Sequence, residues 1–310
     1  ELNVITWDSR REIQITTVRW DFTALIRDLV QNLCDKAARP ELLRFLVIDN
    51  SNGKDDELPS VISEDVNIEI RSFSGEGLQR SVAHASALNI GMKYLDATYV
   101  LITDPDIHVF QPGWDDICRN ELSNDFSALG APYPPWKLGK IHDFPSPVFF
   151  FTETESLLNL HPDWYPFPGA LRRSYNFFAR KILRLGPVCS KERLRKHARL
   201  RSLAQKLERK VGICSPDTGS KIVESMREKS YLPLVFEAVY ADDDRLIMNE
   251  SYSSLLDLAK HFELYLYDDK PFMTHCYGSG VFHWKTERSD QTEFWKESII
   301  AYEESFAKGA

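Results

Sequence analysis

Two carboxylates stand one residue apart at Asp104 and Asp106, directly after the apolar run TYVLIT at residues 98–103. Two carboxylates at the end of one strand can share a hard divalent cation, and that cation can in turn bind a diphosphate. The pair alone is a weak signal, because carboxylates are also common in strand-end loops and helix caps. The apolar run before it strengthens the interpretation as a metal site, since it predicts a buried strand.

The predicted elements that must position this pair are short apolar runs, which alternate with segments of helical pattern. The runs are apolar along most of their length, as expected of strands that helices cover on both faces. Between them, apolar residues recur at helical spacing. The predicted strands cover residues 2–6, 42–48, 66–73 and 98–103, and the predicted helices cover 21–35 and 81–94. This alternation predicts an α/β fold with an open, mostly parallel, Rossmann-like sheet.

Ligands of such a sheet bind beyond the carboxyl ends of its strands. The polar residues there are Thr6 and Trp7 after the first run, Asp49 and Asn50 after the second, and the Asp104–Asp106 turn after the last. We therefore expect these three groups to share one edge of the sheet.

The rest of the chain has a looser pattern. Past residue 112, proline and aromatic residues mark loops and short mixed strands. The sequence has no internal repeat, and no long linker separates the residues before position 112 from those after it. We therefore predict one domain over 1–310, with a regular half at 1–112 and a less regular half at 113–310.

Composition sets the class of protein. The 310 residues are 43% hydrophobic and 27% charged, which is typical of a globular chain. No apolar run approaches the roughly 18 residues of a membrane span, and the first residues lack a secretory layout. The five cysteines are scattered without a C-x-x-C pair, so neither disulfides nor structural zinc are expected. These features predict a cytoplasmic protein, and the net charge of −8 argues against nucleic acid as the main partner.

Two segments carry a family resemblance. LVIDNSN at 46–52, followed by HASALNIGMKYLDATYVLITDPDI at 84–107, resembles the nucleotide-sugar glycosyltransferases of the GT-A fold, particularly the large inverting family two. Those enzymes have a strand ending in Val-Asp-Asp or Val-Asp-Asn, then an Asn-x-Gly helix, an apolar strand and D-x-D. The resemblance covers residues 40–115 well and the remainder loosely. It implies that the half at 1–112 binds the nucleotide sugar and that the half at 113–310 binds the acceptor.

The resemblance implies a nucleotide site at the strand ends. Asp49, with Asn50 beside it, would contact the base or the ribose; the alternative for Asp49 is an Asx-turn that ends the strand. Thr6 and Trp7 would help to form the base pocket. The first run departs from the usual Pro-Thr-Tyr-Asn of the family, so the identity of the base stays open.

The resemblance also implies a donor diphosphate held by a metal. Asp104 and Asp106 would bind Mn²⁺ or Mg²⁺, with Asp106 as the more direct ligand. Arg80 and His84 open the helix that faces the Asp104–Asp106 loop and would approach the ribose or a phosphate. The alternative for His84 is a packed core histidine.

Two late residues complete the implied site. His275 ends the short apolar strand PFMTH and would be a further metal ligand, with His283 as its competitor. Asp217 would be the base that takes the proton of the acceptor hydroxyl, and its alternative role is the N-cap of the helix that follows. Weaker base candidates are Asp143, Glu153 and Glu155.

One stretch differs strongly from the rest in charge. Residues 171–210 hold 14 Lys or Arg and two acids, a net +12, so that the remainder carries −8 − 12 = −20. A helix is predicted over 191–210, with Ser190 as its cap. The stretch is either a solvated basic helix, packed by Leu200, Leu203 and Leu207, or a contact for an anionic membrane surface. In the second case apolar side chains beside it would add shallow contact, namely Phe177, Phe178, Ile182 and Leu183.

The sequence thus predicts a metal-dependent transferase that moves a sugar, with inversion, from a nucleotide diphosphate sugar to the hydroxyl of a glycan or lipid-linked acceptor. It would be cytoplasmic or peripheral at the inner face of the membrane. One rival is a sugar nucleotidyltransferase, although TWDSRR lacks the glycines of the usual phosphate loop. The other is a non-catalytic binding module of the same fold.

Overall fold

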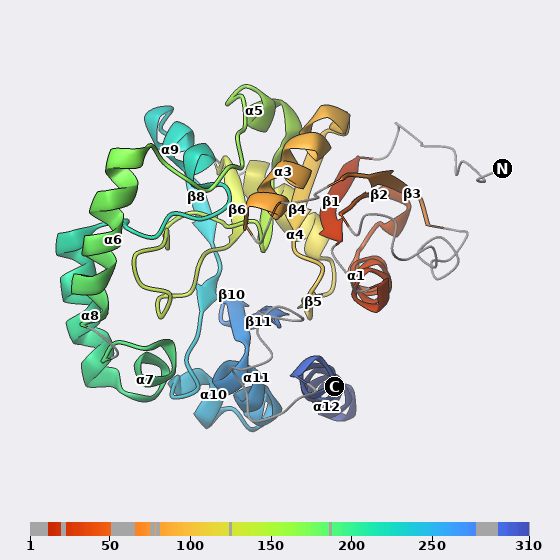
Figure 1. Cartoon of the computed structure of the whole chain (residues 1–310). Coiled ribbons are helices and arrows are strands. Elements are labelled where there is room, and N and C mark those ends of the chain that lie inside the picture. Colours follow the sequence, from red (N-terminus) through yellow and green to blue (C-terminus); the bar gives the residue numbers. More distant parts are fainter. Residues whose placement is uncertain are drawn as a thin grey trace.

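The computed structural model describes residues 12–19, 23–50, 66–74, 78, 81–123, 126–185, 188–276 and 291–309. At its centre lies a seven-stranded sheet with the strand order β3-β2-β1-β4-β7-β6-β8 (Figure 1). The strands are β1 (Ile13–Arg19), β2 (Leu43–Asp49), β3 (Ile68–Ser72), β4 (Tyr99–Thr103), β6 (Ala128–Ala131), β7 (Phe149–Glu153) and β8 (Pro233–Val235). Strands β3, β2, β1 and β4 are parallel, and β7 alone runs antiparallel to both its neighbours. The predicted α/β fold with a mostly parallel sheet is confirmed.

Strand β1 lies between β2 and β4 in the sheet. The sequence analysis assigned no strand to its residues. The predicted strand at 2–6 is outside the described residues. Because Gln14, Thr16, Thr17 and Arg19 give β1 a polar composition, its sequence does not look like a core strand, yet every one of its residues is buried. Buried polar side chains need partners. Arg19 has one in the Asp49 carboxylate, 3.6 Å away.

Helices cover both faces of the central sheet. One face packs against α1 (Thr23–Lys36), whose buried residues include Ile26, Leu29 and Leu33, and against α4 (Trp114–Ser123). The other face packs against α3 (Ser81–Gly91), α5 (Thr154–Leu158) and α9 (Ser220–Glu228). Since alternate residues of each strand point to opposite faces, strands covered on both faces are usually apolar along most of their length. This explains the apolar runs of β2 and β4.

A second, four-stranded sheet with the order β5-β11-β10-β9 lies beside the first. Its strands are β5 (Ile107–Val109), β9 (Glu237–Ala238), β10 (Glu263–Tyr267) and β11 (Lys270–His275). A separate apolar cluster joins it to α10 (Asp244–Met248), α11 (Leu256–His261) and α12 (Gln291–Gly309). Because β5 follows β4 after only a short turn, the chain passes from the first sheet to the second through Asp104–Asp106.

The basic stretch is helical, but not as one helix. It forms α6 (Ala170–Arg184), α7 (Lys191–Lys196) and α8 (Ala198–Val211), seen at the left of Figure 1. The predicted single helix over 191–210 is wrong, because His197 is extended, with φ −127° and ψ 99°. The predicted cap is confirmed, since the Ser190 hydroxyl accepts a hydrogen bond from the Arg193 N–H. Leu203 is exposed rather than packed, and Leu183 is buried rather than available for a surface contact.

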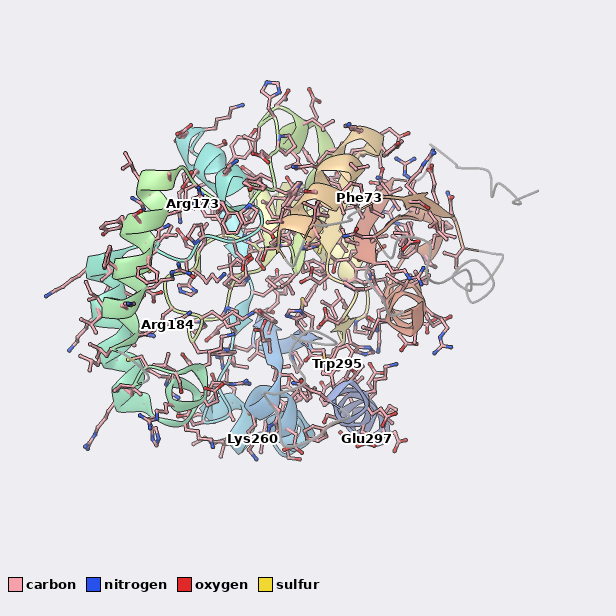
Figure 2. The ribbon with its side chains drawn as sticks, in the orientation of Figure 1. Phe73, Arg173, Arg184, Lys260, Trp295 and Glu297 are labelled. Carbon is pink, nitrogen blue, oxygen red and sulfur yellow. The ribbon has the colours of Figure 1, made fainter. Side chains whose placement is uncertain are left out.

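Short 3₁₀ turns complete the described secondary structure, at Pro40–Leu42, Met92–Tyr94 and Glu250–Leu255. Figure 2 shows the side chains on this framework. Within the described chain, we find no helix with both the length and the apolar character needed to cross a bilayer.

Candidate active site

Asp104 and Asp106 occupy the turn between the two sheets. The Asp104 N–H donates to Val148 O at 3.4 Å, and Asp106 O accepts from the Cys276 N–H at 2.9 Å. These backbone bonds fasten the turn to β7 on one side and to the end of β11 on the other. His275 is the last residue of β11 and pairs with Ile107 of β5. The sheet register therefore brings the histidine to the two aspartates.

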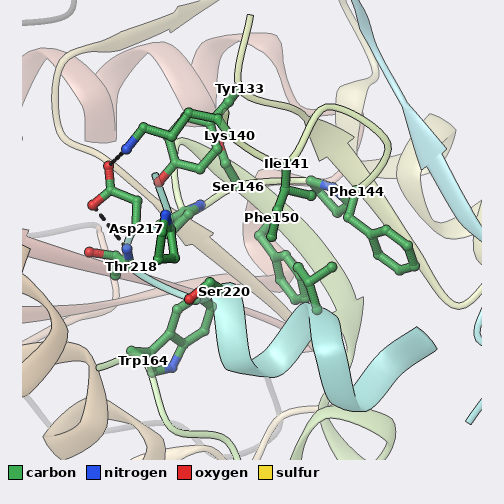
Figure 3. A pocket seen from close by; sticks show the side chains of 15 residues that line it. Tyr133, Lys140, Ile141, Phe144, Ser146, Phe150, Trp164, Asp217, Thr218 and Ser220 are labelled. Atoms are coloured by element: carbon green, nitrogen blue, oxygen red, sulfur yellow. Dashed lines mark hydrogen bonds and ion pairs between the residues drawn. The ribbon is translucent and has the colours of Figure 1, made fainter. Parts of the chain in front are cut away.

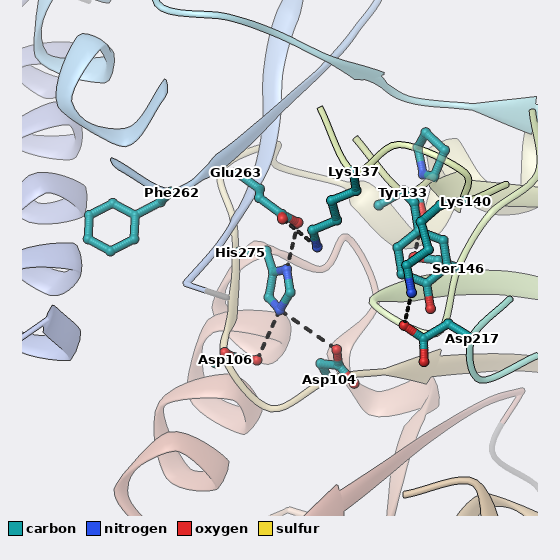
Figure 4. A network of polar contacts seen from close by, with 12 residues as sticks. Asp104, Asp106, Tyr133, Lys137, Lys140, Ser146, Asp217, Phe262, Glu263 and His275 are labelled. Carbon is teal, nitrogen blue, oxygen red and sulfur yellow. Dashed lines mark hydrogen bonds and ion pairs between the residues drawn. The ribbon is translucent and has the colours of Figure 1, made fainter. Parts of the chain in front are cut away.

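The three side chains converge on one point (Figure 4). His275 Nε2 lies 3.2 Å from Asp106 Oδ1 and 3.7 Å from Asp104 Oδ2. One ligand atom from each residue lies within 4.8 Å of the others, and this is the one such group among the described residues. Burial raises the pKa of Asp104, although both His84 and His275 oppose that shift.

The other nitrogen of the His275 ring has its own partner. His275 Nδ1 lies 2.9 Å from Glu263 Oε2, which also accepts from the Tyr265 hydroxyl at 3.0 Å. Burial alone would lower the pKa of His275, but the carboxylates of Asp106 and Glu263 raise it to about 10. Without a metal, the ring is therefore protonated on both nitrogens at neutral pH. A metal ion would replace the proton on Nε2, and Nδ1–H would continue to donate to Glu263.

Glu263 is itself held by a buried cation. Lys137 Nζ lies 2.5 Å from Glu263 Oε1, and the two side chains are 5% and 2% exposed. Burial would raise the pKa of Glu263, but Lys137 and His275 together lower it well below its usual range. Glu263 therefore stays ionised and keeps accepting from His275.

These contacts fit a divalent metal ion. Two carboxylates and a neutral imidazole form a mixed oxygen and nitrogen donor set, which Mn²⁺ accepts more readily than Mg²⁺ does. A carboxylate behind a ligating histidine is the usual arrangement that fixes its tautomer. The residues Asp104, Asp106 and His275, which were predicted as metal ligands, are thus close enough together to bind one ion.

Helix α3 connects this cluster to a second polar group. His84, in its first turn, places Nε2 3.4 Å from Asp104 Oδ1, and its side chain is 24% exposed. Ser81, at the start of the helix, hydrogen-bonds through its side chain with Asp217. His84 is therefore partly accessible beside the aspartates and not a fully packed core residue.

Asp217 lines a narrow pocket whose water-accessible volume is about 10 Å³ (Figure 3). Its carboxylate pairs with the Lys140 ammonium and accepts from the Thr218 N–H at 3.0 Å. Burial would raise the pKa of Asp217, but Lys140 and the backbone N–H lower it. The pocket wall combines polar side chains with aromatic and proline rings, among them Tyr133, Ser146, Pro147, Phe150 and Trp164.

Asp217 does not cap the helix that follows it. The residue at the N-cap of α9 is Gly219, with φ 83°, and no side chain accepts there. The predicted alternative role as an N-cap is wrong, because the carboxylate is directed to Lys140 and to Thr218 instead. The weaker base candidates Glu153 and Glu155 lie at the far end of the sheet, since Glu153 pairs with Tyr99 at the start of β4. Asp143 is exposed and pairs with Arg227.

The predicted nucleotide-binding residues are only partly described. Thr6, Trp7 and Arg80, together with the competitor His283, lie outside the described residues. Asp49 and Asn50 end β2 at the same edge of the sheet as Asp104, and both are buried. In the described part of the chain, neither the oxygen nor the nitrogen of the Asn50 amide has a hydrogen-bond partner.

The sequence analysis missed three charged residues of the site, of which Lys137 and Glu263 are buried and Lys140 is partly buried. Lys137 and Lys140 belong to the loop WKLGK, where lysines would ordinarily be solvated. Glu263 is the first residue of strand β10 and directly precedes the sequence LYLY. This position next to a strand-like sequence is the only signal that could have indicated its burial.

Comparison with known proteins gives the following result. No protein-family model matches the chain, and neither does any curated protein. Among solved structures, TarS from S. aureus matches at a TM-score of 0.38 and 16% identity, over 50% of this chain and 30% of TarS. The mannosyltransferase PcManGT from Pyrobaculum calidifontis, in complex with GDP-Man and Mn²⁺, matches at 0.38 and 11%, over 82% of this chain and 86% of its own. TarS 1-349 in complex with UDP-GlcNAc matches at 0.37 and 14%, over 50% and 48%. At these TM-scores and identities, the likenesses do not establish a shared fold or activity.

Proposed function

We propose that this chain is a metal-dependent glycosyltransferase of the GT-A type, which moves a sugar with inversion from a nucleotide diphosphate sugar to an acceptor hydroxyl. The observation that carries the proposal is the convergence of Asp104, Asp106 and His275 at the carboxyl end of β4. A parallel α/β sheet binds its ligands at that edge. The buried pair Glu263–Lys137 behind His275 supports a histidine that acts as a metal ligand.

The ion would be Mn²⁺ or Mg²⁺, held by Asp104, Asp106 and His275. When bound, it would neutralise the charge of the donor diphosphate and so stabilise it as a leaving group. His84 beside Asp104 would contact a phosphate or the ribose, and Arg80 is proposed to do the same. Asp49, Asn50, Thr6 and Trp7 are proposed to bind the nucleoside. The Asn50 amide suits this role, because it offers one buried donor and one buried acceptor.

Asp217 is our proposed base. Its lowered pKa keeps the carboxylate ionised at neutral pH, which a base requires. The same ion pair with Lys140 makes it a weak base before reaction. The acceptor proton would therefore transfer as its oxygen attacks the anomeric carbon, when that oxygen becomes more acidic.

The acceptor would be a glycan or a lipid-linked glycan that enters beside the pocket of Asp217. Its aromatic and polar lining has the character of sites that bind sugars. A lipid-linked acceptor would place the protein at the surface of a membrane as a peripheral enzyme, and the basic helices would then face anionic lipid.

Calorimetry with a panel of nucleotide sugars, including UDP-GlcNAc and GDP-mannose, tests the proposal. Donor binding should need Mn²⁺, should be lost with a chelator, and should be lost in Asp106→Ala. Asp257→Ala is the matched control, because this exposed aspartate on α11 lies outside the site. Donor binding that is undiminished in EDTA would refute the metal role. If the donor binds in a metal-dependent way but is neither transferred nor slowly hydrolysed, the chain is a non-catalytic binding module.

A further inference from the structure

Helix α6 carries a row of large apolar side chains that is exposed to solvent. Its members are four, three, four and three residues apart, so they lie along one side of the helix. Leu171 is 90% exposed and Phe178 is 64% exposed. The apolar row consists of Leu171, Tyr175, Phe178, Ile182 and Leu185, which lies just past the helix end.

A different side of α6 holds the helix to the protein. Asn176, Ala179 and Leu183 are buried, and the two apolar ones belong to the cluster shared with α8 and the Trp136–Leu138 loop. The apolar row is therefore not needed for packing within the described chain. Contiguous exposed apolar surface of this kind marks a binding surface more often than chance.

The charged side chains on the same helix as the apolar row are all positive. Helix α6 contains five basic residues and no acidic residue. Arg173, Lys181 and Arg184 are exposed, and Figure 2 labels the first and last of them. Other cations of the stretch have structural roles: Arg195 donates to the carbonyls of Ala259 and Phe262, and Arg201 pairs with Asp242.

We infer that α6 is a docking helix for an anionic lipid bilayer, with the apolar row inserted at the level of the headgroups. Interfacial helices combine such a row, including aromatic residues, with flanking Lys and Arg. A second copy of the chain is a poor occupant, because two such helices would bring like charges together without an acid to pair them. The bilayer supplies both the apolar layer and the negative charge.

This surface lies close to the proposed active site along the chain. Trp164 lines the pocket, and the short loop after it leads directly into α6. Tyr165 and Phe167 in that loop are 37% and 43% exposed. Docking through α6 would therefore hold the pocket near the lipid surface, where a lipid-linked acceptor would lie. The docking itself requires neither donor nor metal, so its failure would leave the proposed transfer reaction intact.

Sedimentation with vesicles tests the inference. The full chain should bind vesicles of phosphatidylcholine with 30% phosphatidylglycerol, should not bind pure phosphatidylcholine, and should be released by high salt. The variant Arg173→Gln/Lys181→Gln/Arg184→Gln should weaken binding on the order of 100-fold, since each basic side chain at an anionic surface contributes about a fivefold factor. Its matched control removes three exposed lysines from other elements, Lys93→Gln/Lys260→Gln/Lys270→Gln, and should bind within a few fold of the parent.

A second pair of variants tests the apolar row. Phe178→Ser/Ile182→Ser should lose most of the binding, whereas Ile247→Ser/Met248→Ser, on exposed residues of α10, should retain it. Equal losses in variant and control of either pair would overturn the docking role of α6, as would binding to neutral vesicles or no binding at all. Dimerisation in analytical ultracentrifugation that disappears with Phe178→Ser/Ile182→Ser would instead assign the row to a second copy.

Discussion

Glu263→Gln is the most informative change to the site, because it keeps the size of a buried side chain and removes its charge. The glutamine leaves the Lys137 ammonium opposite a neutral amide, in a place where both side chains are almost inaccessible. Removing one partner of a buried ion pair costs about 3–5 kcal/mol of unfolding free energy. It also replaces the carboxylate that accepts from His275 Nδ1. Loss of such a partner behind a ligating histidine weakens metal binding about 10- to 100-fold.

The two effects can be separated with a double variant. Lys137→Met/Glu263→Gln removes both charges, so it should recover much of the stability in urea unfolding and still bind Mn²⁺ weakly in calorimetry. Lys137→Met alone keeps the hydrogen bond to His275 and should bind Mn²⁺ within a few fold of the parent. Normal Mn²⁺ affinity in Glu263→Gln would refute the reasoning, because Glu263 would then be only the counter-ion of Lys137.

Further changes test the rest of the site and the fold. Asp217→Asn should keep donor affinity while transfer falls by several hundredfold or more, as measured by product formation, and it should lower the melting temperature because Lys140 loses its counter-ion. Lys140→Met should raise the pKa of Asp217, because only the hydrogen bonds from Thr218 and Ser81 then oppose burial, so the acid limb of the kcat/KM profile should move to higher pH. Burial would lower the pKa of His142, but the hydrogen bond to Glu208 outweighs it and raises this pKa. The protonated ring therefore stabilises the fold fully below its ordinary pKa of about 6.5, and this contribution to the free energy of unfolding is lost as pH rises through the raised pKa. His142→Phe should remove this pH dependence, measured by urea unfolding at a series of pH values. Asp115→Ala removes the acceptor of two backbone N–H groups after α1, at 2.6 and 3.0 Å, and should cost about 1–3 kcal/mol in unfolding experiments.

The parts of the fold that could be predicted from the sequence are those whose local pattern agrees with their burial. Strands β2 and β4 are apolar along their length because helices cover both of their faces. Strand β1 is just as buried, although four of its seven residues are polar. Arg19 needs Asp49, and this pairing exists only once β1 and β2 lie side by side. A local pattern carries no information about such a pairing.

The site divides in the same way. The Asp104–Asp106 turn could be predicted because its position after an apolar strand is a local feature. His275 followed from a family resemblance, and its approach to the aspartates depends on the pairing of β5 with β11, which a sequence pattern does not specify. The roles of these residues in binding a metal stay predictions, and the calorimetry described above decides them.

The loop at 132–148 explains why Lys137, Lys140 and Glu263 could not be predicted as site residues from the sequence. It has little regular structure, yet Lys137 from this loop holds Glu263 behind the metal cluster, and Lys140 holds Asp217 in the pocket. Lys137 is buried and Lys140 is partly buried, and lysines are tolerated in such places only where carboxylates compensate them. Because the two lysines are only three positions apart along the chain, a movement of the loop would displace the partners of Glu263 and Asp217 together. A change in this irregular segment should therefore disturb both the carboxylate behind the proposed metal ligand and the proposed base, and so alter donor binding and transfer at once.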